Sequence, residues 1–242
     1  MFPILFQNNS FILYSYPLFM GLGWGIAYQI LFEFLPESFT RMRAQILFWG
    51  MFLFAWLGAK IFFLYTVPHD LSYALMQETN FWLGGGFVFY GGFLGGVFYL
   101  FILKGLKFPI SWNILSSMLP AIAIGHAVGR FGCFLAGCCY GKETTGWWGI
   151  PLHGVHRHPT QLLEFASLLI LGTFLLRSKS KHLTSIYLVS YGLIRLGVES
   201  LRGDLIRGEW GPLTPSQWIS LGLILSGIFI YVRNTRHLER LD

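Results

Sequence analysis

Seven apolar segments, each long enough to cross a hydrocarbon core as a helix, restrict the fold of this chain more than any other feature. About 20 predominantly apolar residues are needed to span a bilayer as a helix. Hydrophobic residues make up 54% of the 242 residues and charged residues only 12%, a composition that excludes an ordinary soluble domain. The segments are centred near Trp24, Phe54, Phe93, Ile122, Leu169, Leu193 and Ile224. We therefore predict an all-α, polytopic integral membrane protein with seven transmembrane helices, in a single domain over residues 1–242.

Basic residues follow alternate segments and predict the orientation. They are Arg41 and Arg43 after the first segment, Lys104 and Lys107 after the third, Arg177, Lys179 and Lys181 after the fifth, and Arg233, Arg236 and Arg240 after the last. Lys and Arg are enriched on the cytoplasmic side, so we expect the N-terminus outside and the C-terminus in the cytoplasm. Met1 to Gly25 has no basic n-region or small-residue cleavage site, so the first span is expected to stay in the mature protein. We read the net charge of +6 as an orientation signal and a contact for anionic lipid, and we expect no nucleic-acid partner.

Charged side chains inside the apolar segments mark the predicted site. Arg130 lies in the fourth segment, within GHAVGRFGCFLAGCCYG, and Arg195 and Glu199 lie four residues apart in the sixth. An arginine at bilayer depth costs roughly 3 kcal/mol on insertion scales, so it indicates a function. A guanidinium also offers a bidentate fork to phosphate oxygens. The alternative for Arg195 and Glu199 is an intrahelical ion pair that steadies the sixth helix.

Five motifs, in order, resemble the bacterial prolipoprotein diacylglyceryl transferase family over about two thirds of the chain. They are GGGFVFYGGFLGG, GRFGCFLAGCCYG, RHPTQLLE, IRLGVESLRGD and TPSQWISLGLILSG. The resemblance implies transfer of a diacylglyceryl group from phosphatidylglycerol, or a similar anionic phospholipid, to the thiol of a lipobox cysteine in a lipoprotein precursor. It also implies a multi-pass enzyme of the bacterial cytoplasmic (inner) membrane, with its active site facing the outer leaflet. We expect no cofactor.

The resemblance assigns the site residues. It implies that Arg130, Arg195 and Glu199 are catalytic. Residue chemistry adds Tyr90 and His126 to the catalytic residues, as possible proton acceptors. The substrate-binding residues that the resemblance implies are Gly91, Gly92, Gly129, Gly132, Cys133, Cys138, His158, Gln161, Glu164 and Arg202. Glu164 lies near the start of an apolar span and is expected to orient an arginine across the helix bundle. Arg202 and Asp204 match a late arginine and acid of the family, and as exposed charges they more often form a solvated loop.

Tyr90 is the first departure from the family pattern, since it replaces a histidine that is taken as the base for the acceptor thiol. A neutral phenol is a poor base unless an arginine stabilises the phenolate. Tyr90 could instead donate a hydrogen bond, and His126, one helical turn before Arg130, could replace the missing base. A hydrogen-bonded core histidine is an equal alternative for His126.

The second departure is the set of cysteines after Arg130. Cys133 replaces an asparagine of the family pattern, Ala136 another, and Cys138 an acid. Cys138 or Cys139 could transiently carry a lipid or acyl group, Cys133 could form a disulfide with either, or all three could be small buried hydrophobes. The nearby His153, His156 and His158 do not follow a recognised zinc spacing, and we expect no metal.

Three functions follow from these motifs and departures. The first is the family reaction on a lipoprotein precursor. The second keeps a phospholipid donor but changes the acceptor or the transferred group, as the missing histidine and asparagines suggest. The third is a non-catalytic phospholipid-binding or translocating membrane protein that uses its arginines for head-group recognition.

Overall fold

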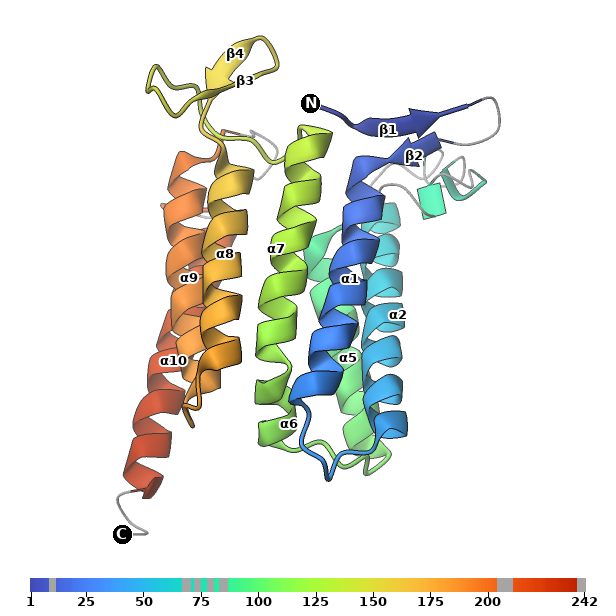
Figure 1. The fold of residues 1–242 in the computed structure, drawn as a ribbon, viewed down its shortest axis with the longest axis vertical. Helices are drawn as coiled ribbons and strands as arrows, with labels where there is room; N and C mark the ends of the chain where they lie inside the picture. Colours follow the sequence, from blue (N-terminus) through green and yellow to red (C-terminus); the bar gives the residue numbers. More distant parts are fainter. Residues whose placement is uncertain are drawn as a thin grey trace. The chain divides into compact units, whose positions relative to one another are not determined.

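The computed structural model describes residues 1–8, 12–66, 71, 75–77, 81–82, 87–203 and 211–238, which are mostly helical (Figure 1). The chain divides into two compact units. One consists of Met1–Ile30 and Ser116–Asp242, and the other of Leu31–Leu115.

Each predicted segment centre lies within a helix, which confirms where the sequence places its helices. The helices are α1 (Ser15–Phe34), α2 (Arg41–Thr66), α5 (Phe89–Gly105), α6 (Trp112–Ser117), α7 (Leu119–Ala136), α8 (Thr160–Arg177), α9 (Leu183–Leu201) and α10 (Pro215–Leu238). Within the described residues, four stretches are long and apolar enough to cross a membrane, namely Arg41–Tyr65, Trp112–Ala136, Thr160–Arg177 and Pro215–Arg236. The structure therefore supports a helical membrane protein with at least these spans.

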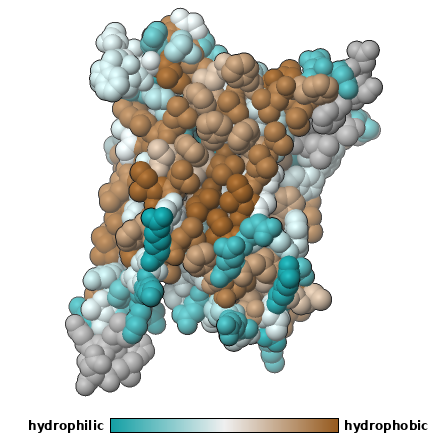
Figure 2. All heavy atoms as spheres, in the orientation of Figure 1, coloured by the Kyte–Doolittle hydropathy of each residue, from teal (hydrophilic) through white to brown (hydrophobic). Residues whose placement is uncertain are grey.

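Exposed apolar side chains cover the middle of the helices. Figure 2 shows hydrophobic residues over the central part of the visible face and hydrophilic residues towards its ends. Among the large apolar side chains with more than half of their surface exposed are Ile61, Phe101, Ile170, Leu225 and Phe229. Apolar surface on this scale is not stable in water and indicates contact with lipid.

The larger unit is a row of packed helices in which α7 contacts α8, α8 contacts α9, and α9 contacts α10. Its core contains Ala123 from α7, Leu171 and Leu175 from α8, and Tyr187 from α9. Small residues allow the backbones to approach closely. A Cβ added to Gly125 of α7 would lie 2.9 Å from the carbonyl oxygen of Gly23 in α1, the kind of contact through which transmembrane helices pack.

The smaller unit is built on the contact between α2 and α5. Gly58 of α2 and Gly91 of α5 each leave no room for a Cβ, because the carbonyl oxygen of the other glycine occupies that position. A Cβ on Gly92 would lie 3.2 Å from the carbonyl oxygen of Ala55. The glycine-rich start of α5 thus has a packing role within this unit.

Two short antiparallel ribbons were not predicted, so the all-α expectation was incomplete. β1 (Ile4–Gln7) pairs with β2 (Ile12–Tyr14), and β3 (Ile150–Leu152) pairs with β4 (Val155–Arg157). The second ribbon turns through His153 and Gly154, whose φ angles are 53° and 82°. Two consecutive positive φ angles are the requirement of a tight hairpin turn. Strands of three or four residues are too short to produce a clear alternating pattern in the sequence.

Two glycines of α9 provide a test of this packing. A Cβ on Gly192 would lie 2.7 Å from Ile224 Cγ1 and 2.9 Å from the carbonyl oxygen of Ser220, whereas a Cβ on Gly197 would meet nothing within 4 Å. We expect Gly192→Ala to destabilise the protein by about 1–3 kcal/mol through overpacking. Gly197→Ala should stabilise it by about 0.5–1 kcal/mol through helix propensity. Thermal unfolding of the two purified variants in detergent measures the difference, and equal midpoints would contradict the packing described.

Candidate active site

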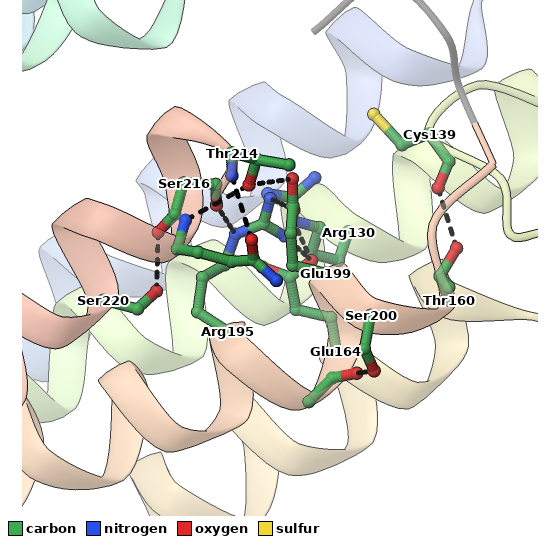
Figure 3. A network of polar contacts seen from close by, with 12 residues as sticks. Arg130, Cys139, Thr160, Glu164, Arg195, Glu199, Ser200, Thr214, Ser216 and Ser220 are labelled. Atoms are coloured by element: carbon green, nitrogen blue, oxygen red, sulfur yellow. Dashed lines mark hydrogen bonds and ion pairs between the residues drawn. The ribbon is translucent and has the colours of Figure 1, made fainter. Parts of the chain in front are cut away.

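A single buried carboxylate joins three helices at the centre of the polar network (Figure 3). Glu164 lies in the second turn of α8, and its side chain is 1% exposed. Its Oε2 atom lies 3.1 Å from Nε of Arg130 on α7 and 3.1 Å from Nη1 of Arg195 on α9. The expected pairing of Glu164 with an arginine across the bundle is confirmed, and it involves two arginines.

Arg195 uses all three of its guanidinium nitrogens within the protein. Nη1 binds Glu164, Nη2 lies 2.6 Å from Oε2 of Glu199, and Nε donates to Oγ of Ser216 at 3.0 Å. Thr214 in turn donates from Oγ1 to Oε1 of Glu199 at 3.2 Å. The predicted i, i+4 pair on α9 is therefore present, and it belongs to a larger network that reaches the start of α10.

Within the described residues, Arg130 is hydrogen-bonded and ion-paired through its Nε atom. Its Nε lies 3.2 Å from Nε2 of His126 and 3.1 Å from Oε2 of Glu164. Across the described part of the chain, its terminal nitrogens Nη1 and Nη2 donate no hydrogen bond. Its side chain is 16% exposed. The arrangement leaves a two-nitrogen fork with the geometry that binds two oxygens of a phosphate.

The network is close to electrically neutral, since two guanidinium groups face two carboxylates. His126 contacts both kinds of group, because Nε2 accepts from Arg130 and lies 3.9 Å from Oε1 of Glu164. Its ring also meets that of Tyr191 edge to face, with centroids 5.7 Å apart. These partners agree with a hydrogen-bonded core histidine. The alternative role of His126 as a base stays a prediction.

The loop after α7 brings the three cysteines together and attaches them to α8. The three sulfur atoms lie within 4.8 Å of one another, and all three cysteines are free thiols. Gln161 donates from Nε2 to the carbonyl oxygen of Cys138 at 2.6 Å, and Thr160 donates from Oγ1 to that of Cys139 at 2.9 Å. The thiol of Cys138 donates to the carbonyl oxygen of Cys133 at 3.6 Å. The disulfide considered for Cys133 is not formed.

Three further predicted residues of this unit contact neighbouring side chains. His158 accepts a hydrogen bond at Nδ1 from Nε1 of Trp148 at 3.0 Å. Gly129 and Gly132 face α1, where added Cβ atoms would lie 3.3 Å from Met20 Sδ and 2.7 Å from Phe19 Cβ. Their contacts are those of helix packing, and a role in substrate binding stays a prediction.

Arg202 corrects the expectation of an exposed charge, since only 6% of its surface is accessible. It is buried because its backbone bridges to Gly141 in the loop after α7. Asp204, its expected partner, lies outside the described residues, as does the side chain of Tyr90. Gly91 and Gly92 belong to the smaller unit, and their assignment to substrate binding is likewise a prediction.

Thr214 and Ser216 were not assigned individually from the sequence, although their motif was noted. Thr214 caps α10, because its backbone N–H donates to Oε1 of Gln217 at 2.9 Å while Gln217 N–H donates to Oγ1 of Thr214 at 3.3 Å. This is a capping box, which a threonine followed three residues later by a glutamine indicates in a sequence. The cap leaves Thr214 Oγ1 and Ser216 Oγ beside the carboxylate of Glu199 and the guanidinium of Arg195.

The profile of a family described as prolipoprotein diacylglyceryl transferase matches residues 3–233. The chain belongs to this family. It is 38% identical over 250 residues to the phosphatidylglycerol–prolipoprotein diacylglyceryl transferase of Clostridium tetani (strain Massachusetts / E88), which covers 95% of this chain and 96% of that protein. Transferase 2 of Clostridium perfringens (strain 13 / Type A) is 38% identical over 194 residues, 72% of each chain. The transferase of Finegoldia magna (strain ATCC 29328 / DSM 20472 / WAL 2508) is 33% identical over 168 residues, 66% of each. Family membership and the apolar helices together identify a bacterial membrane protein of the transferase class.

Replacing Glu164 tests whether this carboxylate holds the three helices together. Glu164→Gln leaves two guanidinium groups without their shared partner, and removing one member of a buried ion pair typically costs about 3–5 kcal/mol. Glu143, which is 66% exposed and lies 3.2 Å from Arg157, is the matched control, and Glu143→Gln should cost less than about 1 kcal/mol. Unfolding free energies measured in mixed micelles compare the two variants.

A second substitution separates lost pairing from lost packing. Adding Arg130→Gln to Glu164→Gln removes one of the stranded charges, so part of the lost stability should return. Additive losses in the double variant would contradict an energetic coupling between these side chains.

Proposed function

We propose that this chain transfers a diacylglyceryl group from phosphatidylglycerol to the thiol of the lipobox cysteine of a lipoprotein precursor. The supporting observation is the guanidinium of Arg130, which is anchored through Nε and donates no hydrogen bond from its terminal nitrogens to the described residues. The relatives in Clostridium tetani and Clostridium perfringens are named for this reaction. A phosphodiester is the part of phosphatidylglycerol that such a fork recognises.

The chemistry follows from the charge that the reaction creates. The acceptor sulfur attacks the glyceryl carbon next to the phosphate, the C–S bond forms, and the C–O bond breaks. The electron pair of that bond passes to the phosphate oxygen, and glycerol phosphate leaves with one more negative charge than the diester had. Arg130 is placed to stabilise this charge, and a fixed donor at such a point is worth about 10²–10³ in rate.

The other residues divide between positioning and binding. Glu164 orients Arg130, and Arg195 with Glu199 holds Glu164 in place. Gln161 and His158 shape the loop at the substrate side. We assign proton acceptance to Tyr90 or His126, and contacts with the lipid or the acceptor to Gly91, Gly92, Gly129, Gly132, Cys133, Cys138 and Arg202.

The position of the network along its helices supports a site open to the outer leaflet. Glu164 lies four residues after the start of α8, about 6 Å along the axis, whereas Arg177 ends the same helix and Lys179 follows it. Arg195 lies six residues before the end of α9. Because basic residues favour the cytoplasmic side, the site belongs near the outer surface of the cytoplasmic membrane. We further propose seven transmembrane helices in one integral domain, with the N-terminus outside and the C-terminus inside.

Arg130→Lys tests the proposal, since a lysine keeps the charge but cannot form the fork. Purified protein is incubated with phosphatidylglycerol vesicles and a synthetic lipobox peptide, and diacylglyceryl addition to the peptide cysteine is followed by mass spectrometry. We expect Arg130→Lys to reduce the rate by about 100-fold or more. Arg177→Lys, an exposed arginine at the end of α8, is the matched control and should retain the full rate.

Two results would overturn the proposal. One is a folded wild-type protein that leaves the peptide unmodified in the presence of phosphatidylglycerol. The other is a lysine variant as active as the wild type. A peptide with serine in place of the lipobox cysteine should remain unmodified throughout.

A further inference from the structure

The three cysteines form the closest gathering of metal-ligating side chains in the described part of the chain. Their sulfur atoms lie within 4.8 Å of one another. Cys133 is buried in the last turn of α7, Cys139 is half-buried, and Cys138 is exposed. The cluster thus has a closed side formed by the helix and an open side in the loop.

The backbone of the loop is fixed in a way that holds the thiols together. Gly137 ends α7 with a φ of 73°, and Cys139 has a φ of 61°, which a residue with a side chain rarely adopts. The carbonyl oxygen of Cys138 accepts a hydrogen bond from Gln161, and that of Cys139 accepts one from Thr160. Both donor residues are only 1% exposed. Gln161 Oε1 is also buried and has no partner in the described residues. The cysteine positions are therefore held by α8.

The spacing suits a thiophilic cation better than a disulfide. Tetrahedral zinc with Zn–S bonds of about 2.3 Å separates its sulfur ligands by about 3.8 Å. The largest sulfur–sulfur distance allowed by the observed limit, 4.8 Å, exceeds that value by about 1 Å. Rotation of the cysteine side chains can close this difference. A disulfide requires about 2 Å between two sulfurs and would leave the third cysteine alone.

The surroundings of the cluster suit the charge of such a site. Three thiols that bind one Zn²⁺ release three protons and form a complex with a charge of −1. Arg130 and Arg202 both lie close enough to interact electrostatically with the sulfur of Cys139. Their positive charges offset that of the complex. The same position of Arg130 places the cluster beside the proposed phosphate fork.

We propose that Cys133, Cys138 and Cys139 bind one zinc ion through three thiolates and leave its fourth position for the thiol of the acceptor. The second half of this inference rests on the proposed function. Three protein ligands and one open position are the pattern of catalytic zinc sites, and a thiol that coordinates zinc is deprotonated. The acceptor thiol displaces water and loses its proton to solvent, so with zinc bound the proton acceptance assigned above to Tyr90 or His126 is not required. Its sulfur then forms the C–S bond, glycerol phosphate leaves, and the thioether product, a weaker ligand, dissociates.

The cation site is tested without the transfer reaction. Protein purified under anaerobic, reducing conditions should contain one zinc per chain by elemental mass spectrometry. Cys133→Ser, Cys138→Ser and Cys139→Ser should each lose it, whereas His156→Ala, on the neighbouring ribbon, should retain it. Because a serine variant could fail to fold, the wild-type protein is also titrated with Co²⁺, which should give the visible absorption bands of tetrahedral thiolate coordination.

The open position is tested on the cobalt-loaded protein in the absence of phospholipid. Adding a lipobox peptide with a free cysteine should change the cobalt bands, and the same peptide with serine should not. Two results would overturn the cation site. One is folded, reduced wild-type protein that binds neither zinc nor cobalt. The other is a disulfide among the three cysteines in protein as isolated from cells. Cobalt binding with identical spectra for both peptides would overturn the acceptor position. Neither measurement depends on diacylglyceryl transfer. Failure of the zinc proposal can therefore be distinguished from failure of the proposed function.

Discussion

The carboxylate of Glu164 is the interaction on which the polar interior of this protein depends. It lies on α8 and receives one guanidinium from α7 and another from α9. Lipid-facing helices gain little from the hydrophobic effect against one another, because the acyl chains are as apolar as their side chains. Close backbone contacts and buried polar pairs must therefore specify which helices pack and in which register. A carboxylate that satisfies two arginines at once fixes both neighbours of α8 at the same depth in the membrane.

The two arginines have different surroundings, which supports the different roles proposed for them. Each guanidinium nitrogen of Arg195 donates to an acceptor, and the three acceptors are Glu164, Glu199 and Ser216. Among the residues that the structure describes, Arg130 is held at Nε, with His126 and Glu164 on that side. A side chain anchored at one edge loses little freedom when its other edge binds a ligand, which is the advantage of a preorganised site. We infer that Arg195 holds the carboxylate of Glu164 in place and that Glu164 orients Arg130. The capped start of α10 supports Arg195 through its serine hydroxyl group.

The sequence predicted the helices and the charged members of the polar network better than it predicted their geometry. Each segment centre predicted from hydropathy lies within a helix, because membrane spans require long apolar runs whatever their partners. The cross-bundle pair of Glu164 was also predicted, since a carboxylate in an apolar span needs a cation. The sequence pattern could not show that Arg195 has an acceptor at each nitrogen whereas Arg130 does not. Part of this difference arises from the hydroxyl groups of Thr214 and Ser216, which the capping of α10 places beside Glu199 and Arg195. The burial of Arg202 was missed for a similar reason, since it follows from a backbone bridge to Gly141, 61 positions earlier in the chain.

The proposed zinc site would give the two departures from the family pattern a common physical explanation. Tyr90 replaces a histidine that could accept a proton, and the loop after α7 contains thiols in place of amide and carboxyl groups. A histidine activates an acceptor thiol by taking its proton. A metal achieves the same result by stabilising the thiolate directly, and the proton passes to water. A chain with a thiolate site beside Arg130 has less need of a base in α5, so the loss of one feature and the gain of the other would compensate. The cysteines would then supply the activation that the histidine supplies in the family pattern.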